Sequence, residues 1–92
     1  MIQSFKNKKT EKLYCGEFVP EYSGFEQQAV RRRQILDSAT SLEDLEQLPS
    51  HRFAALKGDR KGQYSIRMNR QGRICFTWYD DRPQEVEITD YH

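Results

Sequence analysis

The chain has 92 residues and a formal net charge of +1, and 36% of its residues are hydrophobic and 32% charged. These values fit one small globular domain, residues 1–92, and exclude a disordered or membrane-embedded chain. No apolar run approaches a membrane span, and the Lys-rich sequence after Phe5 differs from a signal peptide. We therefore expect a cytosolic protein.

The first half of the chain predicts a helical scaffold. Residues 1–5 fit a short opening strand, and residues 8–15 fit a helix that ends at Gly16. Ser23 and Glu26 have the spacing of a capping box at the start of a longer helix. The predicted apolar side of that helix comprises Phe25, Ala29, Val30, Leu36 and Ala39.

Three consecutive arginines, residues 31–33, lie within this predicted helix and cannot all face the same way. The run has two interpretations, a solvated helix face, which we prefer, or a contact to ribosomal or other RNA phosphate. Farther along, Thr40 and Glu43 form a second capping-box pattern before a short helix that closes near Pro49.

The second half predicts an antiparallel sheet of three strands, residues 64–69, 73–79 and 84–90. Alternation places large apolar residues on one face of each strand and polar residues on the other, so one face of the sheet is dry and the other polar. The predicted inward residues are Tyr64, Ile66, Met68, Ile74, Phe76, Trp78, Val86 and Ile88.

The first hairpin of this sheet should bring two arginines together. If the dry faces coincide, Arg67 falls opposite Arg73, which requires an odd loop such as residues 69–71 with Gly72 left-handed at a bulge. Like charges directly opposite each other cost stability. A sequence that tolerates this pair is suited to binding an anion.

The chain also has a strong charge polarity. Residues 51–73 hold seven basic residues and one acid, a net +6, whereas residues 74–92 carry −4. The ordinary interpretation is a solvated sheet whose opposite charges pair across strands. The alternative is a phosphate-binding surface. The basic residues that would bind RNA phosphate are Lys57, Arg60, Arg67 and Arg70.

Several kinds of site lack support in the sequence. Gly58 and Gly62 do not form a phosphate-binding loop or a dinucleotide fingerprint, and His51 and His92 stand apart from any metal-ligand cluster. No serine-hydrolase elbow is present. We therefore expect no cofactor and no metal, and we interpret the two cysteines, Cys15 and Cys75, as thiols that act as small apolar fillers.

The C-terminus supplies candidate chemistry. Alternation beyond Thr89 sends Tyr91 to the polar face, with Asp90 and His92 beside it, although a terminal Asp-Tyr-His is by itself more often a frayed end. Metal-free phosphodiester cleavage needs proton transfer and cations for the phosphorane charge, and RNA supplies its own 2′-OH nucleophile. His92 titrates in a suitable range, Asp90 can orient it or share the proton, and Tyr91 can donate or stack. Arg73 would neutralise the phosphorane.

Several stretches in order carry a resemblance to a known family. The opening M-I-x-S-F-K, the L-K-G-D-R-x-G, the S-I-R-x-N followed by R-I-C-F-T-W, and the closing V-E-I-T-D-Y-H resemble the HigB-type toxins (the HigB/GraT group) of the RelE/ParE superfamily over essentially the whole chain. The resemblance implies an α+β fold, with N-terminal helices packed on one face of a small, mainly antiparallel sheet. It also implies a type II toxin that acts as an mRNA interferase, cutting mRNA on the ribosome and so arresting translation and growth.

The resemblance also implies partners and site residues. The partners would be the ribosome, mRNA and a HigA-type helix-turn-helix antitoxin; DNA would be reached only through the antitoxin, and no membrane is involved. The functional residues of such toxins fall here on Lys57, Arg67, Arg73, Asp90, Tyr91 and His92.

One position departs from the family pattern. Some HigB toxins carry a further active-site histidine where this chain has Ala54. His51 lies three positions earlier, and along an extended chain it would project to the opposite face. A weakened or redistributed acid–base pair is therefore one interpretation.

Two other functions remain as alternatives. The ParE branch shares the fold and poisons a DNA topoisomerase without enzymatic activity, and a fold does not fix a function; the terminal Asp-Tyr-His argues against it. A plain nucleic-acid-binding or repressor-partner module would need only the basic stretch.

Overall fold

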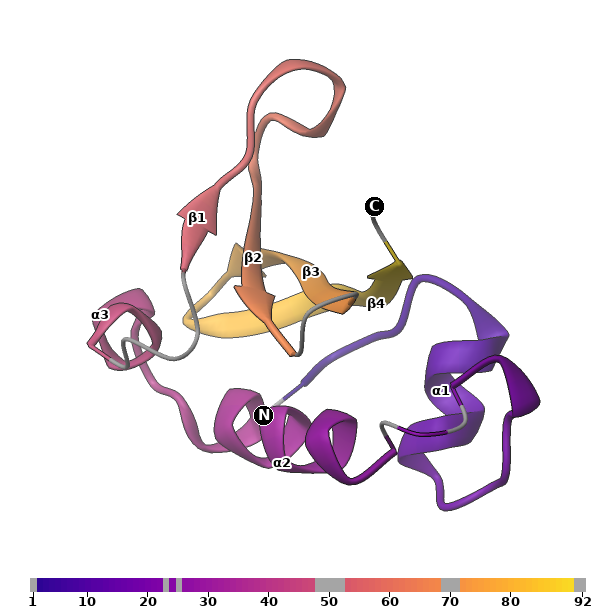
Figure 1. Ribbon diagram of the computed structural model, residues 1–92. Helices are drawn as coiled ribbons and strands as arrows, with labels where there is room; N and C mark the ends of the chain where they lie inside the picture. Colours follow the sequence, from indigo (N-terminus) through magenta and orange to yellow (C-terminus); the bar gives the residue numbers. More distant parts are fainter. Residues whose placement is uncertain (1, 23, 25, 48–52, 69–71, 91–92) are drawn as a thin grey trace.

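The computed structural model describes residues 2–22, 24, 26–47, 53–68 and 72–90. Helices on one side of a four-stranded antiparallel sheet make up this part of the chain (Figure 1). This arrangement confirms the predicted α+β class. The elements are α1 (Lys8–Tyr14), η1 (Pro20–Tyr22), α2 (Glu26–Ser38), α3 (Leu42–Glu46), β1 (Ala54–Ala55), η3 (Gly58–Arg60), β2 (Gln63–Arg67), β3 (Gly72–Tyr79) and β4 (Arg82–Asp90).

The strands follow chain order in the sheet, β1-β2-β3-β4. In Figure 1, α2 runs beneath the sheet, with α1 near one of its ends and α3 near the other, while the loop between β1 and β2 projects away from the helices. The two-residue strand β1, which pairs with Ser65 and Tyr64 of β2, was absent from the sequence prediction. No helix in the described part of the chain combines the length and apolarity needed to cross a membrane.

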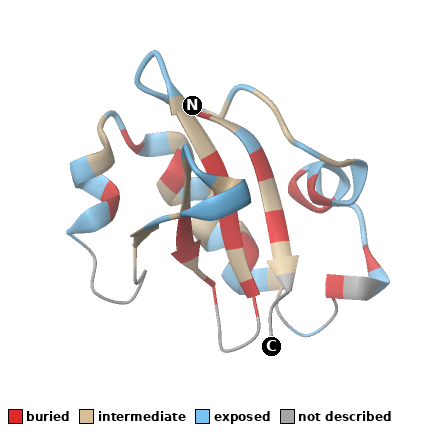
Figure 2. Cartoon of the chain, turned by 90° about the horizontal axis from the view of Figure 1, so that it is seen from above, coloured by how far each residue is buried: buried red, intermediate tan, exposed pale blue. Residues whose placement is uncertain are grey.

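The core lies between the helices and the sheet. Buried residues concentrate in the middle of the strands and on one side of the helices (Figure 2). The predicted inward residues of the strands are buried or packed against this core. From the helical half, the buried residues include Leu13, Tyr14, Ala29, Leu36, Ala39 and Leu45.

The helix boundaries follow local capping. Asn7 starts α1 by accepting a hydrogen bond from the Thr10 amide at 2.9 Å, and Gly16 follows its C-terminus with a φ of 90°, as predicted. At α2, the Glu26 carboxylate accepts from the Gly24 amide at 3.2 Å, while the predicted N-cap Ser23 lies outside the described residues.

The capping of α3 corrects a prediction. Ser41, not Thr40, is the N-cap, and its hydroxyl accepts from the Asp44 amide. The Asp44 carboxylate in turn accepts from the Thr40 amide at 3.0 Å. The predicted capping box was one residue early. Residues 40–43 and residues 41–44 both begin with a hydroxyl residue and end with an acid, so the sequence pattern fits either window.

The first hairpin has the predicted register. Arg67 pairs with Arg73, and the Met68 amide donates to the Gly72 carbonyl at 3.0 Å. This extra pair extends the ladder to Gly72, the first residue of β3. The predicted left-handed conformation of Gly72 depends on its link to residues 69–71, which lie outside the described residues, and it stays a prediction.

The arginine run in α2 is also corrected. Arg31 is exposed, but Arg32 and Arg33 are half-buried and engaged. Arg32 Nε donates to the Arg67 carbonyl at 3.1 Å, and Arg33 pairs with Asp37 at 3.4 Å and lies 5.8 Å from the centre of the Tyr14 ring. The interpretation of the run as a solvated face holds only for Arg31.

Candidate active site

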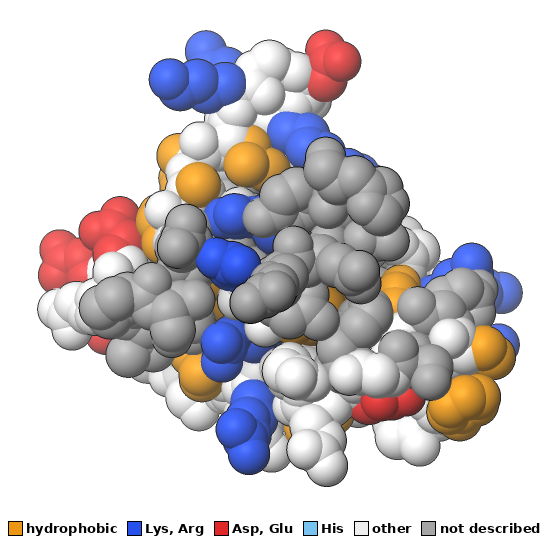
Figure 3. Space-filling view, viewed as in Figure 1, with side chains coloured by type: hydrophobic (Ala, Val, Ile, Leu, Met, Phe, Trp, Pro, Cys, Tyr) orange, Lys and Arg blue, Asp and Glu red, His pale blue; other side chains and the backbone are white. Residues whose placement is uncertain are grey.

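The polar face of the sheet collects the described candidate residues. Three strands contribute side chains to it, because alternate residues of neighbouring antiparallel strands share a face. In the space-filling view, Lys and Arg side chains follow one another from the loop around η3 at the top to α2 at the bottom (Figure 3). Residues on the polar face include Ser65, Arg67, Arg73, Cys75, Thr77, Glu87 and Thr89.

This face is less open than the sequence suggests. Ser65 is 0% exposed and Cys75 is 4% exposed, although alternation assigned both to the solvated side. They pair with each other in the register, and Cys75 also pairs with Glu87. The centre of the polar face is therefore shielded from solvent. The Cys75 thiol at this centre lies 3.5 Å from the Thr89 hydroxyl.

Arg73 is held by the neighbouring strand. Its Nε donates to the Ser65 hydroxyl at 2.8 Å, and its Nη2 approaches the Ser65 carbonyl at 3.5 Å. Arg67 lies directly opposite Arg73, and both are half-buried. The structure thus brings two predicted cationic residues together on adjacent strands.

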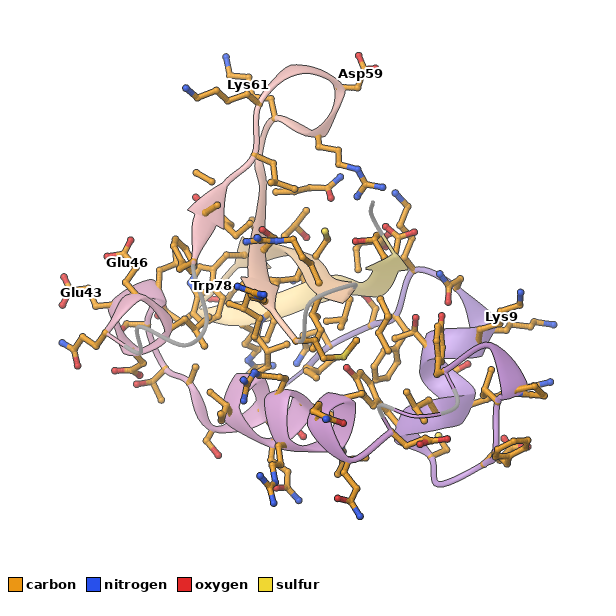
Figure 4. All side chains as sticks on the ribbon, in the orientation of Figure 1. Lys9, Glu43, Glu46, Asp59, Lys61 and Trp78 are labelled. Carbon is orange, nitrogen blue, oxygen red and sulfur yellow. The ribbon has the colours of Figure 1, made fainter. Side chains whose placement is uncertain are left out.

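The loop between β1 and β2 adds two further candidates. Lys57 is exposed just before η3. Arg60 Nη1 donates to Gln63 and to Glu87, both at 3.2 Å, and the Glu87 side chain is 17% exposed. Figure 4 shows Asp59 and Lys61 at the tip of this loop, pointing away from the sheet. The Arg60–Glu87 ion pair therefore joins the loop to β4.

The remaining candidates lie at or beyond the limits of the described residues. The backbone of Asp90 pairs with Gly72, which places this position beside Arg73 in the ladder. Arg70, Tyr91 and His92, as well as His51, lie outside the described residues.

The structure also places Ala54 and the two cysteines. Ala54, where some relatives carry a histidine, lies in β1 opposite Ser65. Cys15 is exposed, so its interpretation as an apolar filler is wrong, whereas Cys75 is buried as predicted.

Among the described residues, no group of three or more His, Cys, Asp and Glu side chains could hold a metal ion.

Sequence reasoning missed three residues that contact the candidate cations. Ser65 accepts from Arg73, Arg32 donates to the Arg67 carbonyl, and Glu87 pairs with Arg60. The predicted register could have identified Ser65. Arg67 lies opposite Arg73, so Ser65, two residues before Arg67 on the same face, is the diagonal neighbour of Arg73. For Arg32 and Glu87 the partners are 35 and 27 residues away in sequence, so no local pattern identifies them.

Comparisons of the chain with a family model and with known proteins agree on one family. The model of the HigB-like toxins, described as the RelE-like toxin HigB of type II toxin–antitoxin systems, matches residues 3–92. The chain is 38% identical over 84 residues to Toxin HigB-1 of Vibrio cholerae, covering 87% of this chain and 86% of that protein. It is 32% identical over 96 residues to Endoribonuclease HigB of Proteus vulgaris, covering 100% of both.

Solved structures share the fold at low sequence identity. The YoeB–YefM complex from Staphylococcus aureus matches with a TM-score of 0.59 and 17% identity, covering 100% of this chain and 98% of that one. A YafQ variant from E. coli matches with a TM-score of 0.66 and 13% identity, covering 98% and 91%. Together with the family match over almost the whole chain, these findings show that the chain belongs to the HigB-like toxins, the RelE-like toxins of type II toxin–antitoxin systems.

Proposed function

We propose that residues 1–92 form one toxin domain that cuts mRNA on translating ribosomes, as a metal-independent endoribonuclease. The observation that carries this proposal is the cross-strand pair of Arg67 and Arg73, because two guanidinium groups on adjacent strands are suited to bind the phosphate of a reacting RNA. The name of the Proteus vulgaris relative, an endoribonuclease, supports the same activity.

In the proposed mechanism the RNA 2′-oxygen attacks the adjacent phosphorus as its proton is removed. The bond from phosphorus to the 5′-oxygen of the next nucleotide breaks, that oxygen takes up a proton, and a 2′,3′-cyclic phosphate is left. His92 and Asp90 accept and return the protons, and Tyr91 donates a hydrogen bond or stacks on a base. Arg73, with Arg67 beside it, neutralises the charge that develops on the phosphorane oxygens. Lys57, Arg60 and Arg70 contact the neighbouring RNA phosphates.

The antitoxin partner follows from the family, since type II systems pair a toxin with an antitoxin. We propose that it is a HigA-type helix-turn-helix protein, that the toxin reaches DNA only through it, and that both act in the cytoplasm. A small reading frame encoding such a protein beside the toxin gene would support this partner.

The function can be tested by inducing the protein and mapping transcript ends by primer extension. New ends within codons are expected in a translated reporter, and none in the same transcript without translation. The purified toxin should cut on programmed ribosomes after chelation, provided that the ribosomes stay intact. Intact mRNA together with topoisomerase-linked DNA breaks would instead support the ParE-like alternative.

The role of Arg73 has its own test. Replacing it with Ala should lower the single-turnover cleavage rate by about 10² to 10³, since one donor to a developing oxyanion is typically worth that much. The matched control is Arg82→Ala, which removes an exposed arginine at the other end of the same sheet. Equal losses in the two variants would argue against a specific role for Arg73.

A further inference from the structure

Ser65 lies at the centre of the sheet with no solvent exposure. It is flanked by Ala54 of β1 and Cys75 of β3. Both its hydroxyl and its carbonyl oxygen face the Arg73 guanidinium, at 2.8 Å from Nε and 3.5 Å from Nη2. A buried hydroxyl in contact with a cation is well placed to fix the direction of that cation, because the contact is charge-assisted.

The direction of Arg73 is informative because its cross-strand partner is another arginine. In the register Arg73 lies opposite Arg67, and like charges in that relation repel each other. The Arg73 side chain instead leans along the sheet to Ser65, the diagonal neighbour. The hydrogen bond therefore holds the Arg73 guanidinium toward Ser65.

The contact with Ser65 involves one particular edge of the Arg73 guanidinium. Nε and Nη2 form one edge of the planar group, and this edge meets Ser65. A guanidinium has five N–H donors, so the contact with Ser65 uses only part of the donor set. Fixing this edge also sets the orientation of the other donors of the planar group, which lowers the cost of reorganisation at the transition state.

We propose that Ser65 is a positioning residue for Arg73, which holds the guanidinium in the orientation needed to stabilise the phosphorane. This inference rests on the proposed function and adds to it a residue that contacts neither the RNA nor the reacting atoms. A serine suits the position because its side chain is small enough for the buried centre of the sheet and still provides an acceptor.

The test is Ser65→Ala, which removes only the hydroxyl. Single-turnover cleavage at saturating programmed ribosomes should slow by about tenfold, the loss expected for one charge-assisted hydrogen bond. Affinity for ribosomes should stay unchanged, because the cation itself remains. The matched control is Thr77→Val, which removes a hydroxyl from the same face, where it donates to the Gln84 carbonyl and not to Arg73; its cleavage rate should match the wild type.

A double-mutant cycle separates positioning from a general structural effect. If Ser65 acts through Arg73, adding Ser65→Ala to Arg73→Ala should cause no further loss of rate. An equal tenfold loss in both backgrounds would overturn the proposal, as would wild-type cleavage in Ser65→Ala. An Arg73→Ala variant that cuts normally would instead remove the proposed role of Arg73. Circular dichroism and thermal unfolding of each variant provide the fold check.

Discussion

Arg32 on α2 donates its Nε–H to the backbone carbonyl of Arg67 at 3.1 Å, which joins the helical layer to the last residue of β2. The contact spans 35 residues of sequence and ends beside the Arg67–Arg73 pair. The helix thereby helps to fix the backbone from which the Arg67 side chain extends.

Replacing Arg32 with Ala should lower the free energy of unfolding by about 1–2 kcal/mol, because a half-buried carbonyl loses a charged donor. Cleavage should also slow as the end of β2 shifts. Arg31→Ala is the control from the same helix; Arg31 is exposed, and its loss should change stability by no more than about 0.5 kcal/mol. Urea unfolding and single-turnover cleavage provide the measurements. Equal effects in the two variants would show that the contact contributes nothing specific.

Removing Tyr91 and His92 should abolish cleavage and preserve the fold. The packing residues of β4, Val86 and Ile88, lie upstream of the deletion and are buried in the core. Binding to the antitoxin should persist for the same reason. Cleavage on programmed ribosomes and circular dichroism test this directly. A well-folded truncated protein that cuts at the wild-type rate would mean that the terminal residues take no part in the chemistry.

The two cysteines should respond differently to substitution. Cys75→Ala should lower the free energy of unfolding by about 1 kcal/mol, because it removes a buried sulfur from the packed centre of the polar face. Cys15→Ala should leave stability unchanged, because Cys15 is exposed. The double variant should still cut mRNA, since neither thiol has a role in the proposed mechanism. A folded double variant without activity would contradict this.

Asp44 gives a pH-dependent contribution to stability. The hydrogen bond from the Thr40 amide lowers the pKa of the Asp44 carboxyl below its usual value. A lowered folded-state pKa stabilises the fold above the unfolded-state pKa, and this contribution is lost as the pH falls through the folded-state pKa. The stability difference between wild type and Asp44→Asn should therefore be present at neutral pH and shrink below about pH 4. Urea unfolding of both proteins at several pH values measures this stability difference. A difference that grows as the pH falls would contradict the prediction.

The sheet was the part of the fold most accessible from sequence. Its register follows from the alternation of apolar residues, and the requirement that dry faces coincide places Arg67 opposite Arg73 without any long-range information. One further pair continues this register, because the Met68 amide donates to the Gly72 carbonyl at the end of the hairpin.

Burial and side-chain partners were harder to predict. Ser65 and Cys75 alternate as outward residues, yet both are buried, because burial depends on what covers a face and not only on parity. Likewise, Arg32 was assigned to solvent with its neighbours, since helical spacing cannot show which of three arginines reaches a distant strand. The cationic pair of the candidate site could thus be predicted, whereas the residues that orient it could not.

The outer edge of β4 has a consequence for association with other chains. The Val86 amide donates to the Ser4 carbonyl, and the Val86 carbonyl accepts from the Lys6 amide. The Ile88 amide donates to the Thr10 hydroxyl, and the Glu85 amide donates to the Ser4 hydroxyl. At the opposite edge, β1 has only two residues. Along these described residues, the sheet offers little template for amyloid-type stacking or for a fifth strand donated by another molecule. At these two described edges, we therefore expect a binding protein to contact the chain chiefly through side chains.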